Sequence, residues 1–235
     1  MSTQNDPMGQ AILDFEKNGI DQDIIVSSDL CEDDVISSAY LFRSFEDMPQ
    51  IEQTALSRSS GKILDIGAGA GIHASHLKDQ GMDVSCIDIS PRSISYLKKN
   101  GLDARVANFF DLKDEKYDTL LMLMNGIGIS GTLSNLENTL LQAKSLLNKG
   151  GKILCDSSDI KYLYTDDDGG MWVDLNTIYY GNFKFQMKYN GHETAWFDWL
   201  YADFDKLKEA AVKTGFSAQK IMDKNDQYLA ELIKL

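Results

Sequence analysis

Residues 63–73 of this chain read ILDIGAGAGIH, an apolar run that ends in three closely spaced glycines. The run before Gly67 is typical of a buried strand, and Ile72 begins a segment with helical spacing. Glycine at positions 67, 69 and 71 removes the β-carbon where the chain turns and where a ligand can lie against bare backbone. The third glycine comes one position earlier than in the G-x-G-x-x-G pattern of dinucleotide-binding proteins. Taken alone, the loop also fits a flexible glycine turn in any α/β protein.

A second strand that ends in an acidic residue follows the glycine loop. Residues 82–88 read MDVSCID, and Ile89, Ser90 and Pro91 come next. A carboxylate at Asp88 can accept hydrogen bonds from both hydroxyls of a ribose, and it lies about twenty residues past the first glycine, as this role requires. Ser90 is a suitable N-cap for a helix that has Pro91 in its first turn. The alternative is that Asp88 is an ordinary turn residue.

Strands and helices alternate along most of the chain. The pattern predicts strands at 62–66, 83–88, 103–107, 118–124 and 151–156, helices at 72–80, 92–100 and 133–147, and two closing strands at 216–222 and 227–234. This order indicates an α/β fold with helices on both faces of a largely parallel sheet. Ligands of such sheets bind beyond the carboxyl ends of the strands, where this chain has Asp65, Asp88, Asn108, Asn125 and Asp156.

The residues from Asp65 to Gly71 form the pattern D-x-G-x-G-x-G, which resembles motif I of the class I S-adenosylmethionine-dependent methyltransferases. Further matches follow in order at residues 105–111, 117–126 and 146–154. The resemblance covers most of residues 61–235 and implies a Rossmann-like methyltransferase domain over this range. Its sheet would have seven strands, mostly parallel, with an antiparallel last strand. It also implies S-adenosyl-L-methionine as the cofactor.

The same resemblance implies which residues bind the cofactor. Asn108 stands where many relatives carry an aspartate that contacts adenine, and an amide can both donate to and accept from the adenine edge. The cofactor-binding residues that the resemblance implies are Asp65, Gly67, Ala68, Gly69, Gly71, Asp88, Ile89, Asn108, Phe109 and Met124.

Residues 1–60 precede this domain and are interpreted as a helical lid. Two apolar stripes with helical spacing and a third helix starting at Pro49 support this reading. In related enzymes, such leading helices lie across the cofactor pocket. Tyr40 and Arg43 would then point inward, where Arg43 could hold the methionine carboxylate or an acidic substrate. The alternative is a solvated arginine on an amphipathic helix. The two stripes are Met8, Ala11, Ile12 and Phe15, and Val35, Ala39 and Phe42.

Aromatic residues concentrate in residues 162–204, which hold thirteen of them and all three tryptophans. The ranges 183–189 and 194–201 read as two strands joined by an Asn-Gly turn, so we expect an inserted β-hairpin at about 160–201. Its aromatic rings, including those of Trp172, Trp196 and Trp199, would wall the acceptor pocket. The alternatives are a homodimer interface and an extension of the core.

Composition narrows the possible partners. The 235 residues are 43% hydrophobic and carry a net charge of −13, with 12 acidic against 3 basic residues in residues 1–60. Such a surface repels nucleic acid. Three widely spaced cysteines without a C-x-x-C pattern predict no metal site. There is no spanning apolar run and no secretory signal, so we expect one soluble cytoplasmic domain with no membrane partner.

The predicted function is methyl transfer by in-line displacement to a small-molecule acceptor, or to a peptide. A sulfonium methyl group is already activated, so the protein must chiefly align the nucleophile and exclude water. A catalytic residue is not identified, although His73 in the first helical turn is one candidate base. Asn125 and Asp156 are candidate acceptor ligands, as are Tyr40, Arg43, Trp172 and Trp196. The alternatives are a catalytically silent adenosylmethionine-binding subunit and, less favoured, a nicotinamide oxidoreductase.

Overall fold

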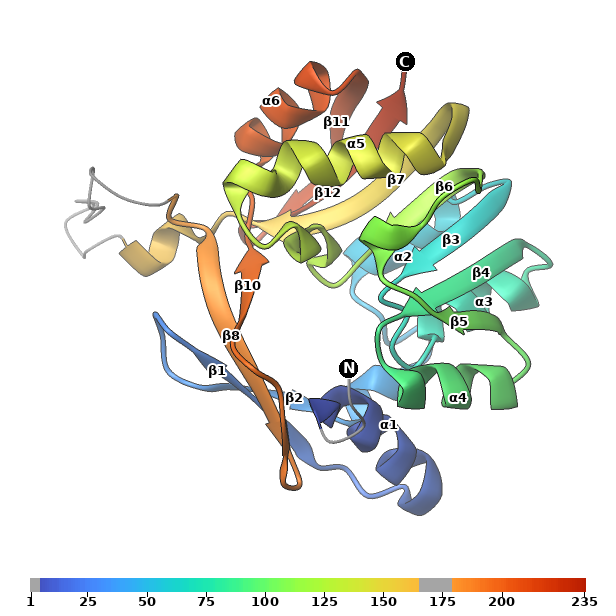
Figure 1. Ribbon diagram of the computed structural model, residues 1–235, viewed down its shortest axis with the longest axis vertical. Coiled ribbons are helices and arrows are strands. Elements are labelled where there is room, and N and C mark those ends of the chain that lie inside the picture. Colours follow the sequence, from blue (N-terminus) through green and yellow to red (C-terminus); the bar gives the residue numbers. More distant parts are fainter. Residues whose placement is uncertain (1–4, 165–178) are drawn as a thin grey trace.

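A seven-stranded sheet forms the centre of the computed structural model, which describes residues 5–164 and 179–235 (Figure 1). The strand order is β11-β12-β7-β6-β3-β4-β5. Neighbouring strands from β7 to β5 are parallel, while β12 runs antiparallel to both β7 and β11. The strands are β3 (Lys62–Ile66), β4 (Asp83–Asp88), β5 (Asp103–Val106), β6 (Tyr117–Met122), β7 (Leu147–Ser158), β11 (Phe216–Lys224) and β12 (Gln227–Lys234). The predicted α/β fold and its antiparallel last strand are confirmed.

Helices cover both faces of this sheet, and each face has its own apolar core. One face packs against α5 (Leu136–Leu146) and α6 (Phe204–Lys213), and the other against α2 (Gln50–Arg58), α3 (Ile72–Asp79) and α4 (Pro91–Lys99). The helix before β7 ends at Leu146, earlier than predicted, and the Gly150-Gly151 pair lies within an irregular start of β7. None of the helices in the described part of the chain is long and apolar enough to cross a bilayer.

The N-terminal segment is only partly helical. Helix α1 (Pro7–Asn18) begins after the N-cap Asp6 and buries Ala11 and Ile12, as its apolar stripe predicts. The second predicted helix is wrong: its residues form strand β2 (Asp34–Ser37) and the short 3₁₀ helix η2 (Ala39–Phe42). The physical reason is that β2 pairs antiparallel with β1 (Asp23–Ser28), which sequence spacing alone does not reveal.

The inserted hairpin joins this N-terminal segment in a second sheet, of order β10-β8-β1-β2, with β9 paired to β8. Strand β8 (Asn182–Tyr189) turns at Asn190 and Gly191 into β9 (His192–Glu193), and β10 (Phe197–Leu200) follows. Both turn residues have positive φ, 43° and 77°, as the tight Asn-Gly turn requires. In Figure 1 this sheet lies beside the carboxyl edge of the main sheet, next to α1. The second sheet therefore faces the edge at which open α/β sheets generally bind ligands.

Candidate functional site

The glycine loop leaves the carboxyl end of β3 in a left-handed path. Gly67, Gly69 and Gly71 have φ of 75°, 54° and 73°, a region that residues with a β-carbon rarely adopt. The backbone N–H groups of Gly67 and Ala68 both donate to the carbonyl of Ile87, at 2.9 and 3.1 Å, which fixes the loop against β4. Because Gly71 is also the N-cap of α3, the loop presents the start of a helix to the site.

Asp88 ends β4 directly beside this loop. Its carboxylate accepts from the backbone N–H of Gly69 at 2.9 Å and from that of Ser90 at 2.8 Å. Burial raises the pKa of Asp88, and these two hydrogen bonds oppose the rise. Each carboxylate oxygen keeps a second lone pair, so the side chain can still accept from two ligand hydroxyls. The contacts also show that Asp88 holds the glycine loop in place, a role that the sequence did not reveal.

Asp65 lies in β3, two residues before Gly67, and it is 2% exposed. Its Oδ2 is buried without a hydrogen-bond partner in the described part of the chain. Burial raises the pKa of this carboxyl, while the nearby His73 acts in the opposite direction. A buried carboxylate oxygen without a donor is costly, so an ammonium group brought by a ligand would be stabilised here.

A cavity of about 400 Å³ brings several of the predicted residues together. One wall comes from the main sheet and includes Ile66, Gly67, Asp88, Ile89, Asn108, Phe109 and Phe110. Asn108 accepts from the backbone N–H of Phe110 at 3.1 Å through Oδ1, which leaves its amide N–H groups as donors for a ligand. The opposite wall comes from α1 and the second sheet and includes Asp6, Met8, Met187, Thr194, Phe197, Asp198 and Trp199. The cavity therefore has a polar floor at Asp88 and a mostly apolar roof.

Asp6 and Ser90 both line the cavity, and the sequence revealed Ser90 only as an N-cap and Asp6 not at all. Asp6 is the N-cap of α1 and Ser90 the N-cap of α4, and the hydroxyl of Ser90 donates to Asp6 Oδ2 at 2.7 Å. A β-carbon at Gly9 would overlap both side chains, so glycine is needed for this close approach of α1 to α4. The sequence does offer Asp6-Pro7 as a typical helix start, but residue spacing does not show that Asp6 contacts Ser90.

Met124 and Asn125 follow β6 in the left-handed conformation, with φ of 60° and 56°. The backbone N–H of Asn125 donates to both oxygens of Asp156 at 3.0 and 3.1 Å. Its side chain accepts from the hydroxyl of Ser157 at 2.8 Å and donates to the carbonyl of Leu200. The structure thus brings Asn125 and Asp156 together, but Asn125 is occupied in joining β6 to β7 and β10.

Arg43 and Tyr40 lie side by side as expected, although on a 3₁₀ helix. The guanidinium stacks 3.9 Å from the centre of the Tyr40 ring and binds both oxygens of Glu52 at 2.6 and 2.5 Å. Glu52 also contacts His73 Nε2 at 2.7 Å, and all three charged or titratable side chains are buried. Arg43 is therefore committed to Glu52, which the sequence did not show, and Glu52 links the N-terminal segment to α3.

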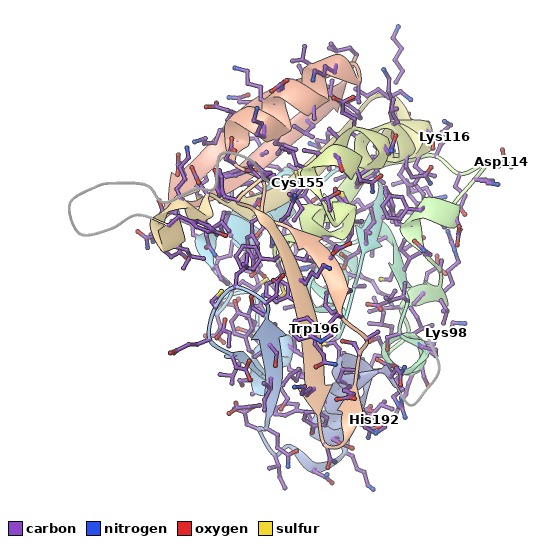
Figure 2. The ribbon with its side chains drawn as sticks, turned by 60° about the vertical axis from the view of Figure 1, so that its left-hand side comes forward. Lys98, Asp114, Lys116, Cys155, His192 and Trp196 are labelled. Carbon is purple, nitrogen blue, oxygen red and sulfur yellow. The ribbon has the colours of Figure 1, made fainter. Side chains whose placement is uncertain are left out.

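The tryptophans occupy different environments. The indole of Trp199 lies over Gly128, where a β-carbon would overlap its Nε1, and it lines the cavity. Trp196 is 49% exposed on the segment between β9 and β10, and Figure 2 shows it part-way along the hairpin that ends at His192. It is not among the cavity-lining residues. Trp172 lies outside the described residues. Within the described ranges, no three His, Cys, Asp or Glu side chains are grouped to hold a metal ion.

Comparison with known proteins gives consistent results. The sequence model of a family described as "Methyltransferase domain" matches residues 38–220. The crystal structure of a SAM-dependent methyltransferase from Bacteroides fragilis in complex with S-adenosyl-L-homocysteine is 42% identical, with a TM-score of 0.92, and the alignment covers 100% of this chain and 98% of that one. A sugar N-methyltransferase from Streptoalloteichus sp ATCC 53650 has 13% identity, coverage of 78% and 85%, and a TM-score of 0.54, which shows the fold alone.

A curated relative, described as an uncharacterized methyltransferase from Staphylococcus carnosus (strain TM300), is 29% identical over 145 residues. The match covers 53% of this chain and 65% of the length of that relative.

Proposed function

Because this chain belongs to the S-adenosylmethionine-dependent methyltransferases, we propose that it transfers the methyl group of this cofactor to a small-molecule acceptor by in-line displacement. The observation that carries the proposal is the convergence of the glycine loop, Asp88 and Asn108 on one cavity. When bound, the cofactor supplies an activated sulfonium methyl group, so the chain must chiefly bind, align and exclude water.

Each predicted cofactor residue has a place in this proposal. The bare backbone of Gly67, Ala68, Gly69 and Gly71 would let the amino-acid arm lie close, and the Asp65 oxygen that has no partner among the described residues would accept its ammonium group. Asp88 would accept from the ribose hydroxyls. Ile89, Asn108 and Phe109 would hold the adenine, with Asn108 as the donor to its edge, and Met124 would contribute from the loop after β6. These are the assignments that binding experiments must test.

The residues also indicate which acceptors are disfavoured. Among residues 5–164 and 179–235, the charged side chains that line the cavity are Asp6, Asp88 and Asp198, all acidic. Carboxylates at the wall repel phosphates, so a nucleic acid or a phosphorylated metabolite fits poorly. The mostly apolar roof favours a neutral or cationic small molecule with an apolar part.

The test is calorimetric titration with S-adenosylhomocysteine and NAD, followed by transfer of a labelled methyl group into a metabolite extract. We expect micromolar affinity for S-adenosylhomocysteine, roughly −8 kcal/mol. Asp88→Ala should weaken binding by about 2–4 kcal/mol through loss of two charge-assisted hydrogen bonds. Asp83→Ala is the control, since Asp83 is exposed at the opposite end of β4.

Because Asp88 also binds the glycine loop, the melting temperature of each variant must be measured, and Asp88→Asn should fold while binding less tightly than the parent. Preference for NAD would contradict the proposal. Tight binding without methyl transfer to any fraction would instead favour a catalytically silent cofactor-binding subunit.

A further inference from the structure

A change of register in the inserted hairpin decides which aromatic side chain faces the cavity. Near its turn, Lys188 lies opposite Glu193. Further along, Phe185 lies opposite Phe197, so the chain after the turn holds one extra residue, a β-bulge. Without that residue, Trp196 would lie opposite Phe185, because a shift of one residue moves every side chain to the other face. The bulge therefore explains why Phe197 lines the cavity while Trp196 is 49% exposed.

Thr194 holds this bulge in place and is 7% exposed. Its hydroxyl accepts from the backbone N–H of Met187 at 3.0 Å, and its own backbone N–H donates to the carbonyl of Met187 at 3.0 Å. The side chain of Gln186 donates to the carbonyl of Thr194 at 2.9 Å. Because these hydrogen bonds fix the chain three residues before Phe197, the ring of Phe197 is held ready at the cavity wall.

The end of the hairpin next to the bulge lies over the exit of β4. Met187 and Met8 of α1 pack against one apolar cluster that includes Ala70 of the glycine loop. The start of α1 is in turn joined to the chain after β4, because Asp6 accepts from the hydroxyl of Ser90. Helix α1 therefore holds this end of the hairpin beside the acid that ends β4.

The other end of the hairpin is attached over β6 and β7. The side chain of Asn125, after β6, donates to the carbonyl of Leu200 at 3.3 Å. The backbone N–H of Ala202 donates to the hydroxyl of Ser157 in β7 at 3.0 Å. Figure 1 shows the hairpin running between the end of β7 and α1. Strand β10 thus crosses the carboxyl edge of the main sheet, and Phe197 begins it on the side of β4.

The cavity places Phe197 opposite the residues proposed to bind the adenosyl group. Its lining joins Asp88 and Asn108 on the main sheet to Met187 and Phe197 on the hairpin. In the part of the chain that the structure describes, residues 124–125 at the exit of β6 are not among this lining. The volume of about 400 Å³ is near the low end of the range for pockets that hold one small molecule.

We propose that the inserted hairpin completes the adenosyl site, with Phe197 packing on the adenosyl group from the side opposite Asn108. The inference rests on the methyltransferase function proposed above. An apolar ring held against a purine base removes both surfaces from water, and the contact does not depend on a hydrogen bond. The hairpin then serves the cofactor as well as the acceptor. The acceptor is left with the Trp199 end of the roof, over η4 (Gly126–Ser130).

Calorimetry with two ligands tests this inference without knowledge of the acceptor. S-adenosylhomocysteine carries the adenosyl group and the amino-acid arm, whereas 5′-methylthioadenosine carries the adenosyl group without that arm. Phe197→Ala should weaken the binding of both ligands by the same factor, about five- to hundredfold. Where Phe197→Ala does not fold, Phe197→Leu tests the same contact, because it keeps most of the apolar volume and loses the ring.

Phe185→Ala is the matched control. Phe185 lies directly opposite Phe197 on the same face of the second sheet, with ring centres 6.5 Å apart, but it is not among the residues that line the cavity. Both variants therefore remove one ring from the same face of the sheet, and only one of them removes a ring from the cavity. The control should bind both ligands as the parent does, and melting curves show whether each variant is folded.

The outcomes separate the two proposals. If the parent protein does not bind S-adenosylhomocysteine, the proposed function fails. If the parent binds it and a folded Phe197 variant binds it equally well, the adenosyl assignment of the hairpin is overturned and the proposed function stands. An equal loss in Phe185→Ala would trace the effect to packing of the second sheet, and a loss confined to S-adenosylhomocysteine would trace it to the amino-acid arm. Either result would also overturn the assignment.

Discussion

The hydrogen bond between Asp6 and Ser90 joins the N-termini of α1 and α4 in the lining of the cavity that also contains Asp88, so its removal should affect both folding and cofactor binding. Asp6→Ala removes an N-cap hydrogen bond to Gly9 N–H, worth about 1 kcal/mol. It also removes the buried charge-assisted bond from the Ser90 hydroxyl, worth about 1.5–3 kcal/mol. The free energy of unfolding should therefore fall by about 2.5–4 kcal/mol.

Ser90→Ala removes the same shared bond together with the cap that Ser90 provides to Ser93 N–H in α4. Since the shared bond can be lost only once, the double variant should be less destabilised than the sum of the single variants, by about 1.5–3 kcal/mol. Urea unfolding of the four proteins measures this coupling. Asp14→Ala is the control, because Asp14 lies about two turns further along the same helix, where it accepts from the Gln10 side chain at 2.8 Å.

Titration of the same proteins with S-adenosylhomocysteine tests the link to function. Asp6, Pro7 and Met8 line the cavity, so a loosened α1 should weaken binding by about tenfold or more. Additive effects on unfolding, within about 0.5 kcal/mol, would show that the two caps do not act as one contact. Unchanged affinity in a folded Asp6→Ala protein would refute the reasoning that α1 belongs to the cofactor site.

Two further predictions follow from buried contacts. Gly128→Ala should lower the free energy of unfolding by about 1–3 kcal/mol, because the added β-carbon overlaps the Trp199 indole. In urea unfolding, the double variant with Trp199→Leu should recover part of this loss. An equally large loss from Gly128→Ala in the parent and in the Trp199→Leu background would place the strain elsewhere. Burial raises the pKa of Asp156 from 3.8 to about 6, so the folded state favours the protonated form and loses stability as pH rises from about 4 through 6. Asp156→Asn should therefore be more stable than the parent above pH 6, by about 3 kcal/mol at most, and identical pH profiles of melting would contradict this.

The central part of the fold could be predicted because its determinants are local. The glycine loop, the acid that ends β4 and the N-cap Ser90 each act within a few residues of one another. The Asn-Gly turn of the hairpin could likewise be predicted, since its two positions require positive φ, which asparagine and glycine adopt most easily. Such features fix backbone geometry wherever they occur, so the sequence alone placed Gly67, Asp88 and Asn108 at one edge.

The N-terminal sheet could not be predicted in the same way. Val35, Ala39 and Phe42 recur at helical spacing, yet Val35 pairs with Ile25 in β2 and β1. The partner of β1 on its other side is β8, where Ser28 lies opposite Phe185, far along the chain. Periodicity reports which face of an element is apolar and not which distant strand completes the sheet. The β-branched run from Ile24 to Val26 was the available signal for a strand.

Strand β1 joins the N-terminal segment to the hairpin, because it lies between β2 and β8 in the second sheet. Deleting residues 1–48 would remove α1, β1 and β2 together and expose the backbone edge of β8, whose N–H and carbonyl groups now pair with residues 25–28. It would also remove Asp6 from the lining of the cavity and Arg43 from its contact with Glu52. We therefore expect that deletion of this segment disrupts the second sheet and the cavity lining. It shares one sheet with the hairpin that roofs the cavity, and point changes at Asp6 and Arg43 will report on its role more clearly than truncation.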